Sequence, residues 1–221
     1  YKEDGRSTNL SSSEATVIFK RWTEFYTKLK MPRTMDFYNR FRTGSCPLGI
    51  STHTMYTTLK AAAPEIDGKW GVALVPGTVR EDGTISHVTS GGGSACSIMK
   101  NTNNLDASWK FIKWWVSADT QLNYSNEIET ILGPTGRVSV SNIKAFESLQ
   151  WDIDMRDTIV TAMKQIREVP EYPGSYYVSR SVYQSFWNVV ENNKNAKETL
   201  LKYNEEANVE IERKWRQYGN R

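Results

Sequence analysis

The side chains that could act as nucleophiles or bases in this chain are few and poorly placed for catalysis. A nucleophilic side chain needs a general base nearby and a third group that orients the base. Only two histidines are present, His53 and His87, and neither lies in a Gly-x-Ser-x-Gly motif. Cys46 precedes Pro47 in an apolar segment, which is a poor setting for a reactive thiolate. The sequence therefore indicates no nucleophilic catalytic centre.

Two pairs of carboxylates, Glu127 with Glu129 and Asp152 with Asp154, have the residue type used in glycoside hydrolysis. One residue separates the acids of each pair, so their side chains diverge on a helix, as is typical of a solvated face. The glycine run at residues 91–93 is followed by Ser-Ala-Cys rather than by the spaced glycines of a nucleotide-binding fingerprint. A carbohydrate-active enzyme therefore stays only as the alternative class.

The aromatic content is the unusual feature of the composition. The chain has 8 tryptophans and 11 tyrosines among 221 residues. Their flat faces and polar edges suit the binding of sugar rings, although packing in the core is the simpler role for most of them. The 28 basic and 25 acidic residues give a net charge of only +3, without a basic stripe or zinc-ligand spacing, so nucleic acid is not an expected partner.

Other counts set further limits. The mean hydropathy is −0.58, and no run of about 18 apolar residues indicates a membrane span. Two cysteines, Cys46 and Cys96, are too few for a disulfide scaffold. Counting alone leaves a bridge between these two cysteines open.

Helical periodicity and short apolar runs predict a helix-rich chain with a few strands. Helices are expected over residues 11–30, 56–63, 105–116, 142–149, 152–167, 179–192 and 195–218. Strands are expected over residues 47–51, 71–75 and 95–99. This mixture indicates an α/β fold. The expected buried stripes are Ile18, Trp22, Phe25 and Leu29 in the first helix, Ala107, Phe111 and Trp114 or Trp115 in the third, and Ala196, Leu200, Tyr203, Ala207, Ile211 and Trp215 in the last.

Several motifs stand in an order that resembles a known family. Residues 37–51 read Phe-Tyr-Asn-Arg-Phe-Arg-Thr-Gly-Ser-Cys-Pro-Leu-Gly-Ile-Ser, and residues 71–77 read Gly-Val-Ala-Leu-Val-Pro-Gly. After the glycine run, residues 106–115 read Asp-Ala-Ser-Trp-Lys-Phe-Ile-Lys-Trp-Trp. These segments resemble the C-terminal part of extracellular solute-binding proteins of family 1, the receptors of ABC importers. The resemblance is closest to the large Gram-positive lipoproteins of that group, and it runs from about residue 12 to residue 219.

The resemblance implies a particular form of the α/β class: a periplasmic-binding-protein-like (type II) C-terminal lobe with a crossing piece of the N-terminal lobe. Residues 1–90 and 146–221 would form the C-terminal lobe, and residues 91–145 would cross the hinge into the other lobe. Because family members begin with a signal peptide and a complete first lobe, we expect this chain to be a C-terminal fragment. Cys46 and Cys96 would then belong to different lobes, so we expect two free, buried thiols.

Three segments are expected to supply ligand contacts in such a receptor. Residues 51–54 follow a predicted strand, at the end where open α/β sheets bind ligands. Residues 90–93 fit a crossing between lobes, where glycines let the backbone approach a ligand. Residues 173–180 resemble the family loop that returns to the cleft, with tyrosines to stack on a sugar and an arginine to donate hydrogen bonds. The candidates are Ser51, Thr52, His53, Thr54, Ser90, Gly91, Gly92, Glu129 from the other lobe, Tyr176, Tyr177 and Arg180.

Each candidate segment also has a purely structural interpretation. His53 would be a hydrogen-bonded turn residue, the glycines a plain flexible loop, and the loop before residue 180 would pack one tyrosine inward and pair its arginine with a local acid.

The resemblance implies a substrate-binding component of an ABC import system that captures an extracellular solute between two lobes. A sugar or oligosaccharide is the expected solute; the alternatives are a peptide receptor or a carbohydrate-active enzyme. A membrane permease and its ATPase would be the partners, and no cofactor or metal is needed. We expect a lipoprotein on the outer face of the cytoplasmic membrane, with signal and anchor outside this sequence. An unpaired strand at residues 95–99 would also favour a swapped or partnered oligomer.

Overall fold

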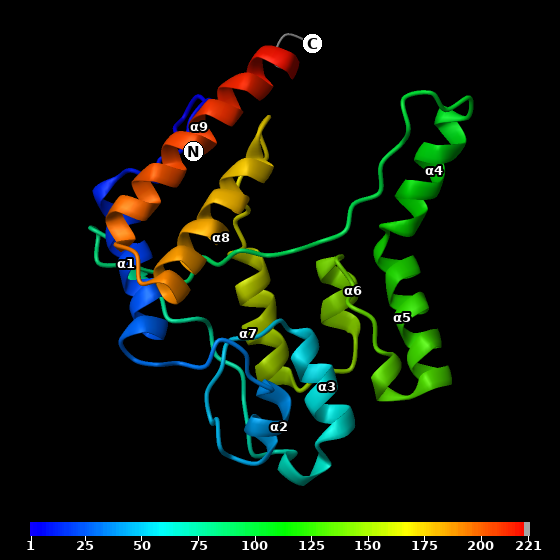
Figure 1. Cartoon of the computed structure of the whole chain (residues 1–221). Coiled ribbons are helices and arrows are strands. Elements are labelled where there is room, and N and C mark those ends of the chain that lie inside the picture. Colours follow the sequence, from blue (N-terminus) through cyan, green and yellow to red (C-terminus); the bar gives the residue numbers. More distant parts are fainter. Residues whose placement is uncertain (219–221) are drawn as a thin grey trace. The chain divides into compact units, whose positions relative to one another are not determined.

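The computed structural model describes residues 1–218, and this part of the chain is mostly helical (Figure 1). The one sheet among these residues is an antiparallel pair of two-residue strands, β1 (Thr78–Val79) and β2 (Ile85–Ser86). Two 3-10 turns, η1 (Pro64–Ile66) and η2 (Pro134–Gly136), accompany the helices. The helices are α1 (Ser13–Thr27), α2 (Phe37–Arg42), α3 (Thr54–Ala62), α4 (Leu105–Trp115), α5 (Ala118–Leu132), α6 (Ile143–Ser148), α7 (Ile153–Lys164), α8 (Ser175–Asn192) and α9 (Ala196–Tyr218).

The chain divides into two compact units. Unit 1 combines Tyr1–Met35 with the chain from Val169 onward, and unit 2 is the intervening stretch, Asp36–Glu168. Unit 1 is therefore built from two segments that are distant in sequence, whereas unit 2 is continuous.

Unit 1 is a bundle in which α1, α8 and α9 pack together (Figure 1). Helix α1 begins where the Ser12 side chain accepts a hydrogen bond from the Ala15 amide at 3.1 Å, as the capping-box spacing predicts. Its inner face contributes Phe19, which packs in one buried cluster with residues of α8 and α9. The buried members of this cluster are Phe19, Phe186, Val189 and Leu200.

The N-terminal segment of unit 1 lies along α9. The Thr8 amide donates to the side-chain oxygen of Asn208 at 2.7 Å. Further along, the indole N–H of Trp215 donates to the Gly5 carbonyl at 3.1 Å. Residues 1–10 are thereby fixed to the surface of α9 by contacts that span most of the sequence.

Unit 2 has its core between α6 and α7. The buried members are Val140, Ala145, Phe146, Leu149, Ile159 and Val160. The hairpin of unit 2 turns at Asp82-Gly83, where the Asp82 carboxylate accepts from the Thr84 amide at 2.9 Å. Gly83 has φ +80°, the left-handed conformation that such a turn requires.

The three expected strands are wrong: residues 47–51, 71–75 and 95–99 are all irregular. Leu48 is 85% and Ile50 is 79% exposed, so the first of these apolar runs is not covered by a neighbouring layer. A strand exists only through hydrogen bonds to a partner strand, and no partner lies beside these segments within residues 1–218. The described residues therefore contain the helices of the expected α/β fold, but their only sheet is one pair of two-residue strands.

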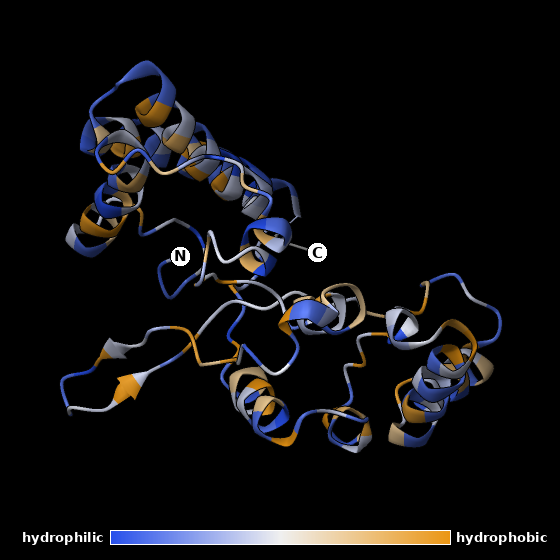
Figure 2. Cartoon of the chain, turned by 90° about the horizontal axis from the view of Figure 1, so that it is seen from below, coloured by the Kyte–Doolittle hydropathy of each residue, from blue (hydrophilic) through white to orange (hydrophobic). Residues whose placement is uncertain are grey.

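Only one of the three expected buried stripes lies inside. The stripe of α9 is confirmed, with Leu200, Ala207 and Ile211 all buried. The stripe expected in α1 is wrong, since Ile18 and Leu29 are each 67% exposed. The stripe expected in α4 is also wrong, because Phe111 is 57% and Trp114 55% exposed, and Trp115 is only partly covered. Figure 2 shows hydrophobic positions mixed with hydrophilic ones along the helices of the chain.

The prediction for the two cysteines is correct for their oxidation state and wrong for their burial. Both thiols are free, as predicted, but neither is buried: Cys46 is partly exposed and Cys96 is exposed. The irregular segments that carry them explain this, because no second layer covers either segment. Among residues 1–218, no helix is both long and apolar enough to cross a membrane.

Candidate functional site

The turn before α3 carries the first group of candidate residues. The hydroxyls of Thr52 and Thr54 are hydrogen-bonded to each other at 2.7 Å, and Ser51 is exposed beside them. The ring of His53 points the other way, with Nε2 hydrogen-bonded to the Ser139 hydroxyl at 2.7 Å. The same ring meets the ring of Phe146 edge-on, with centroids 5.8 Å apart. The hydroxyls of this turn are therefore exposed, and its histidine fixes the turn to Ser139 and Phe146.

Burial lowers the pKa of His53 below its ordinary value of 6.5. The unfolded chain then takes up a proton at a higher pH than the folded protein does. Between these two pKa values the unfolded state binds more protons, so the free energy of unfolding falls as the pH is lowered through 6.5.

We predict that His53→Gln reduces this pH dependence, because an uncharged amide keeps hydrogen-bonding capacity without titrating. The measurement is the free energy of unfolding from urea titrations between about pH 5.5 and 7.5, where histidine is the side chain that ordinarily titrates. Equal slopes against pH for the parent and the variant would show that His53 is not the group responsible.

Glu129, the candidate from α5, is held by Arg137. The two side chains form a two-pronged ion pair, with nitrogen–oxygen distances of 2.9 and 2.6 Å. The guanidinium carbon of Arg137 also lies 5.1 Å from the centre of the Trp151 ring. Trp151 in turn stacks on Phe146 at 4.5 Å, so Glu129 and His53 belong to one connected aromatic and ionic cluster. Both oxygens of Glu129 are used inside unit 2.

The glycine segment packs against the end of α7. Thr89 forms an isolated parallel bridge with Ile166, and the Thr89 carbonyl accepts from the Arg167 amide at 3.0 Å. A Cβ at Gly91 would lie 2.7 Å from the Ile166 side chain, so Gly91 permits a close approach. Gly92 has open space at the same position, and Ser90 is exposed. Gly91 is thus a packing residue, and Ser90 and Gly92 face outward.

The loop before α8 distinguishes the two candidate tyrosines. Tyr176 is 69% exposed, whereas the hydroxyl of Tyr177 accepts a hydrogen bond from Arg213 on α9 at 3.2 Å. Arg180 is exposed and forms no ion pair with any residue that the structure describes. Tyr176 and Arg180 are four residues apart on α8, so they lie on the same side of the helix. An exposed ring and an unpaired guanidinium therefore stand side by side.

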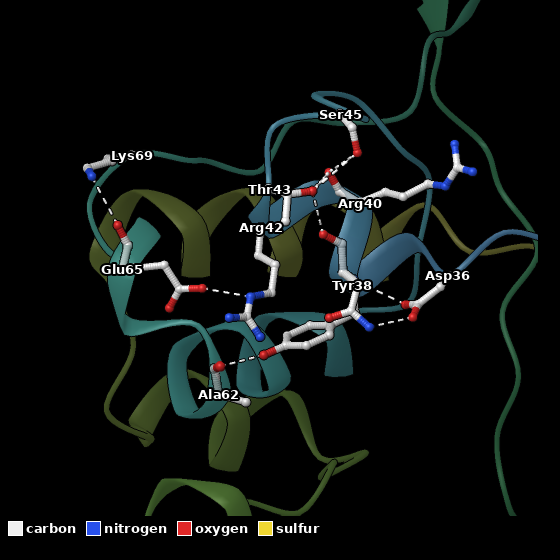
Figure 3. Close-up of polar contacts among 10 residues, drawn as sticks. Asp36, Tyr38, Arg40, Arg42, Thr43, Ser45, Ala62, Glu65 and Lys69 are labelled. Carbon is white, nitrogen blue, oxygen red and sulfur yellow. Dashed lines mark hydrogen bonds and ion pairs between the residues drawn. The ribbon is translucent and has the colours of Figure 1, made fainter.

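The aromatic and basic motif at residues 37–42 forms α2 and has a structural role (Figure 3). Asp36 caps the helix by accepting from the Asn39 amide at 3.1 Å. The Tyr38 hydroxyl donates to the Ala62 carbonyl, and Arg42 pairs with Glu65 at 2.7 Å. These contacts hold α2 against α3 and η1.

A second feature of the same motif is the glycine that follows it. A Cβ at Gly49 would lie 2.1 Å from the ring of Phe37, so only glycine lets the chain cross that ring. The order of residues in this motif is explained by packing within unit 2.

The candidates fall into separate groups. His53 and Glu129 are joined through Phe146, Trp151 and Arg137 in unit 2, whereas Tyr176, Tyr177 and Arg180 belong to unit 1. Arg137 and Ser139, which fix Glu129 and His53, were missed by sequence reasoning because nothing in their local pattern marks them. Among residues 1–218, no group of three or more His, Cys, Asp or Glu side chains could hold a metal ion.

Comparison with known families gives the class of the protein. Residues 2–148 match the family described as bacterial extracellular solute-binding protein. The match covers 147 of 221 residues, so this chain belongs to that family. No curated protein matches the chain significantly.

Membership of the family settles several expectations. The protein is a solute-binding component of ABC import systems and not an enzyme, so the carbohydrate-active enzyme is no longer an alternative. The family implies a periplasmic-binding-protein-like fold, an extracellular location, a solute as ligand and an ABC permease as partner. The matched residues include the His53 turn, the glycine segment and Glu129; they end before the loop that carries Tyr176 and Arg180.

Proposed function

We propose that the solute is a sugar or an oligosaccharide and that Tyr176 and Arg180 contact it directly. The observation that carries this proposal is the pairing of an exposed ring, Tyr176 at 69%, with an unpaired guanidinium one helical turn away. A pyranose ring has an apolar face that stacks on an aromatic side chain, and hydroxyls that accept hydrogen bonds from a planar guanidinium.

The remaining parts of the proposal concern the intact receptor. Ser51, Thr52 and Thr54 supply hydroxyls, and Ser90 and Gly92 supply backbone and side-chain polar groups, to a solute held between two lobes. The lobes follow the boundaries that the family resemblance implies, with residues 91–145 crossing between them. The mature protein is a lipoprotein on the outer face of the cytoplasmic membrane, where its permease receives the solute.

Calorimetry with a panel of oligosaccharides and short peptides tests the proposal. Removing the ring by Tyr176→Ala should weaken carbohydrate binding about 30-fold, since a central aromatic contact contributes about 2 kcal/mol. Tyr177→Phe is the matched control, because it removes only the hydroxyl that Arg213 contacts and should leave binding unchanged.

Two outcomes would contradict the proposal. Carbohydrate binding that is as tight in Tyr176→Ala as in the parent would show that the loop before α8 is structural. Binding of peptides but of no carbohydrate would show that the protein is a peptide receptor.

A further inference from the structure

The outer face of α8 continues beyond Tyr176 and Arg180 as a strip of aromatic side chains. Residues 176, 180, 183 and 187 lie within an arc of about 60° when successive residues turn by about 100°. Tyr176 is 69% and Tyr183 62% exposed, whereas Trp187 is only partly exposed, packs against the core of unit 1 and meets the Tyr183 ring at 5.8 Å. The buried residues Ser181, Ser185 and Val189 lie on the opposite side of the helix. We call Tyr176, Arg180, Tyr183 and Trp187 the α8 strip.

The α8 strip ends at a pocket within unit 1. The guanidinium carbon of Arg33 lies 5.5 Å from the centre of the Trp187 ring, and Arg33 also pairs with Glu191 on α8. Arg33 and Glu191 line a pocket of about 540 Å³ together with Tyr26, Val190 and residues 30–32. Strip and pocket therefore adjoin through Arg33. The strip itself spans about 16 Å, the rise of 11 helical residues.

The charges on this surface are unbalanced. Arg180 on the strip and Lys30 at the pocket form no ion pair with any described residue, 1–218. Glu191, the acid that lines the pocket, already pairs with Arg33. Two cations without a protein partner favour a ligand that brings negative charge.

The backbone of Lys30 makes this lysine useful for a test. It follows α1 with φ +57°, the left-handed conformation in which helices usually end on glycine. The Met31 amide donates to the Phe25 carbonyl at 3.0 Å and closes the helix around Lys30. Lysine is strained in that conformation, because its Cβ approaches the following carbonyl.

We propose that the α8 strip and its pocket bind a linear acidic oligosaccharide of the uronic-acid type. Sugar rings stack on Tyr176 and Tyr183, and carboxylates of the ligand pair with Arg180 and Lys30. The length of the strip suits a chain of about three rings. This inference rests on the proposed function, that the solute is a carbohydrate, and adds the class of carbohydrate and the residues that extend its site.

The exposed rings and the guanidinium of the α8 strip favour a carbohydrate ligand over a peptide. Peptides are generally held through the edge of a sheet, an apolar groove for a helix, or a groove for a polyproline segment. The α8 strip lies on a regular helix, whose backbone groups are hydrogen-bonded within the helix and offer no free edge. Its ligand contacts must therefore come from ring faces and charged side chains.

Calorimetry on the whole protein with trigalacturonate, and with maltotriose as a neutral trisaccharide, tests the proposal. Arg180→Gln and Lys30→Gly should each weaken trigalacturonate binding about tenfold and reduce its dependence on salt. The matched control is Lys110→Gln, which removes an exposed charge from unit 2 and should change nothing. Tyr183→Ala should weaken binding of the uronate trimer without lowering the unfolding temperature, because its ring is mostly outside the core.

Lys30→Gly separates a functional role from a structural one. Glycine relieves the strained backbone, so the unfolding temperature should rise while trigalacturonate affinity falls. A residue with only a structural role would not change these two quantities in opposite directions.

Several outcomes would overturn the inference. They are undetectable binding of trigalacturonate, equal affinity for both trisaccharides with no effect of Arg180→Gln, or tighter binding of a short single-stranded oligonucleotide. If Tyr176→Ala and Arg180→Gln both weaken binding of carbohydrates while the Tyr183 and Lys30 variants bind like the parent, the proposed function stands and the extended acidic site is wrong.

Discussion

Replacing Phe146 by alanine should cost about 3–5 kcal/mol of the free energy of unfolding, as is usual when a buried aromatic side chain is deleted from a core. Phe146 is 1% exposed and lies in the core of unit 2. Its ring stacks on Trp151 at 4.5 Å and meets His53 edge-on at 5.8 Å. The variant therefore removes packing from the core and from the cluster that holds the turn at residues 51–54. Urea titration followed by tryptophan fluorescence measures the loss.

Phe146→Leu is the control for this prediction. It keeps much of the buried apolar volume, so its loss should be clearly smaller than that of the alanine variant. Removing the ring also opens the surroundings of His53, so the pKa of His53 should move back toward its ordinary value in Phe146→Ala. An alanine variant as stable as the parent would mean that the ring is not packed as described.

Gly174→Ala should also be strongly destabilising, by about 2–4 kcal/mol, because it combines backbone strain with a steric clash. Gly174 precedes α8 with φ +98°, and a Cβ there would lie 2.9 Å from the Cα of Ile211 on α9. Backbone cannot move aside as the end of a flexible side chain can. The loss should appear as a lower urea midpoint with an unchanged slope.

Gly83→Ala separates the two causes. Gly83 has φ +80° and open space at the position of the Cβ, so its variant carries the strain without the clash. We expect it to lose about 1–2 kcal/mol. Equal losses for the two variants would contradict the close approach of α8 and α9 at Gly174.

The helices of unit 1 were predictable because their signals are local. Ser12 caps α1 as expected, and the regular apolar spacing over residues 196–215 identifies the buried face of α9. For α1 the spacing was ambiguous, because apolar residues cover a wide arc of that helix. The face that is buried contains Phe19 rather than Ile18, and that choice is made by the contacts of α1 with α8 and α9. The sequence of α1 alone does not determine which of its faces is buried.

The strands were not predictable, for a related reason. Residues 47–51 and 71–75 have the composition of strands, but a strand forms only where another strand offers its hydrogen bonds. The same limit applies to the site. Sequence spacing brings Tyr176 and Arg180 to one side of α8, yet it does not reveal that Arg213 engages Tyr177 or that Arg137 engages Glu129. Those partners come from other elements, and only the tertiary structure identifies them.

The pairing of Thr8 with Asn208, 200 residues away, has a consequence for the order of folding. Closing a chain segment of that length costs roughly 5 kcal/mol of entropy, far more than one hydrogen bond returns. The α8–α9 hairpin needs no such closure, so it should form early, and the N-terminal segment should attach afterwards. During synthesis α1 must remain without its full set of partners until α9 has been made. A product that ends before α9 would lack Leu200 and leave the Phe19 face of α1 only partly covered by α8, and such exposed apolar surface leads to aggregation.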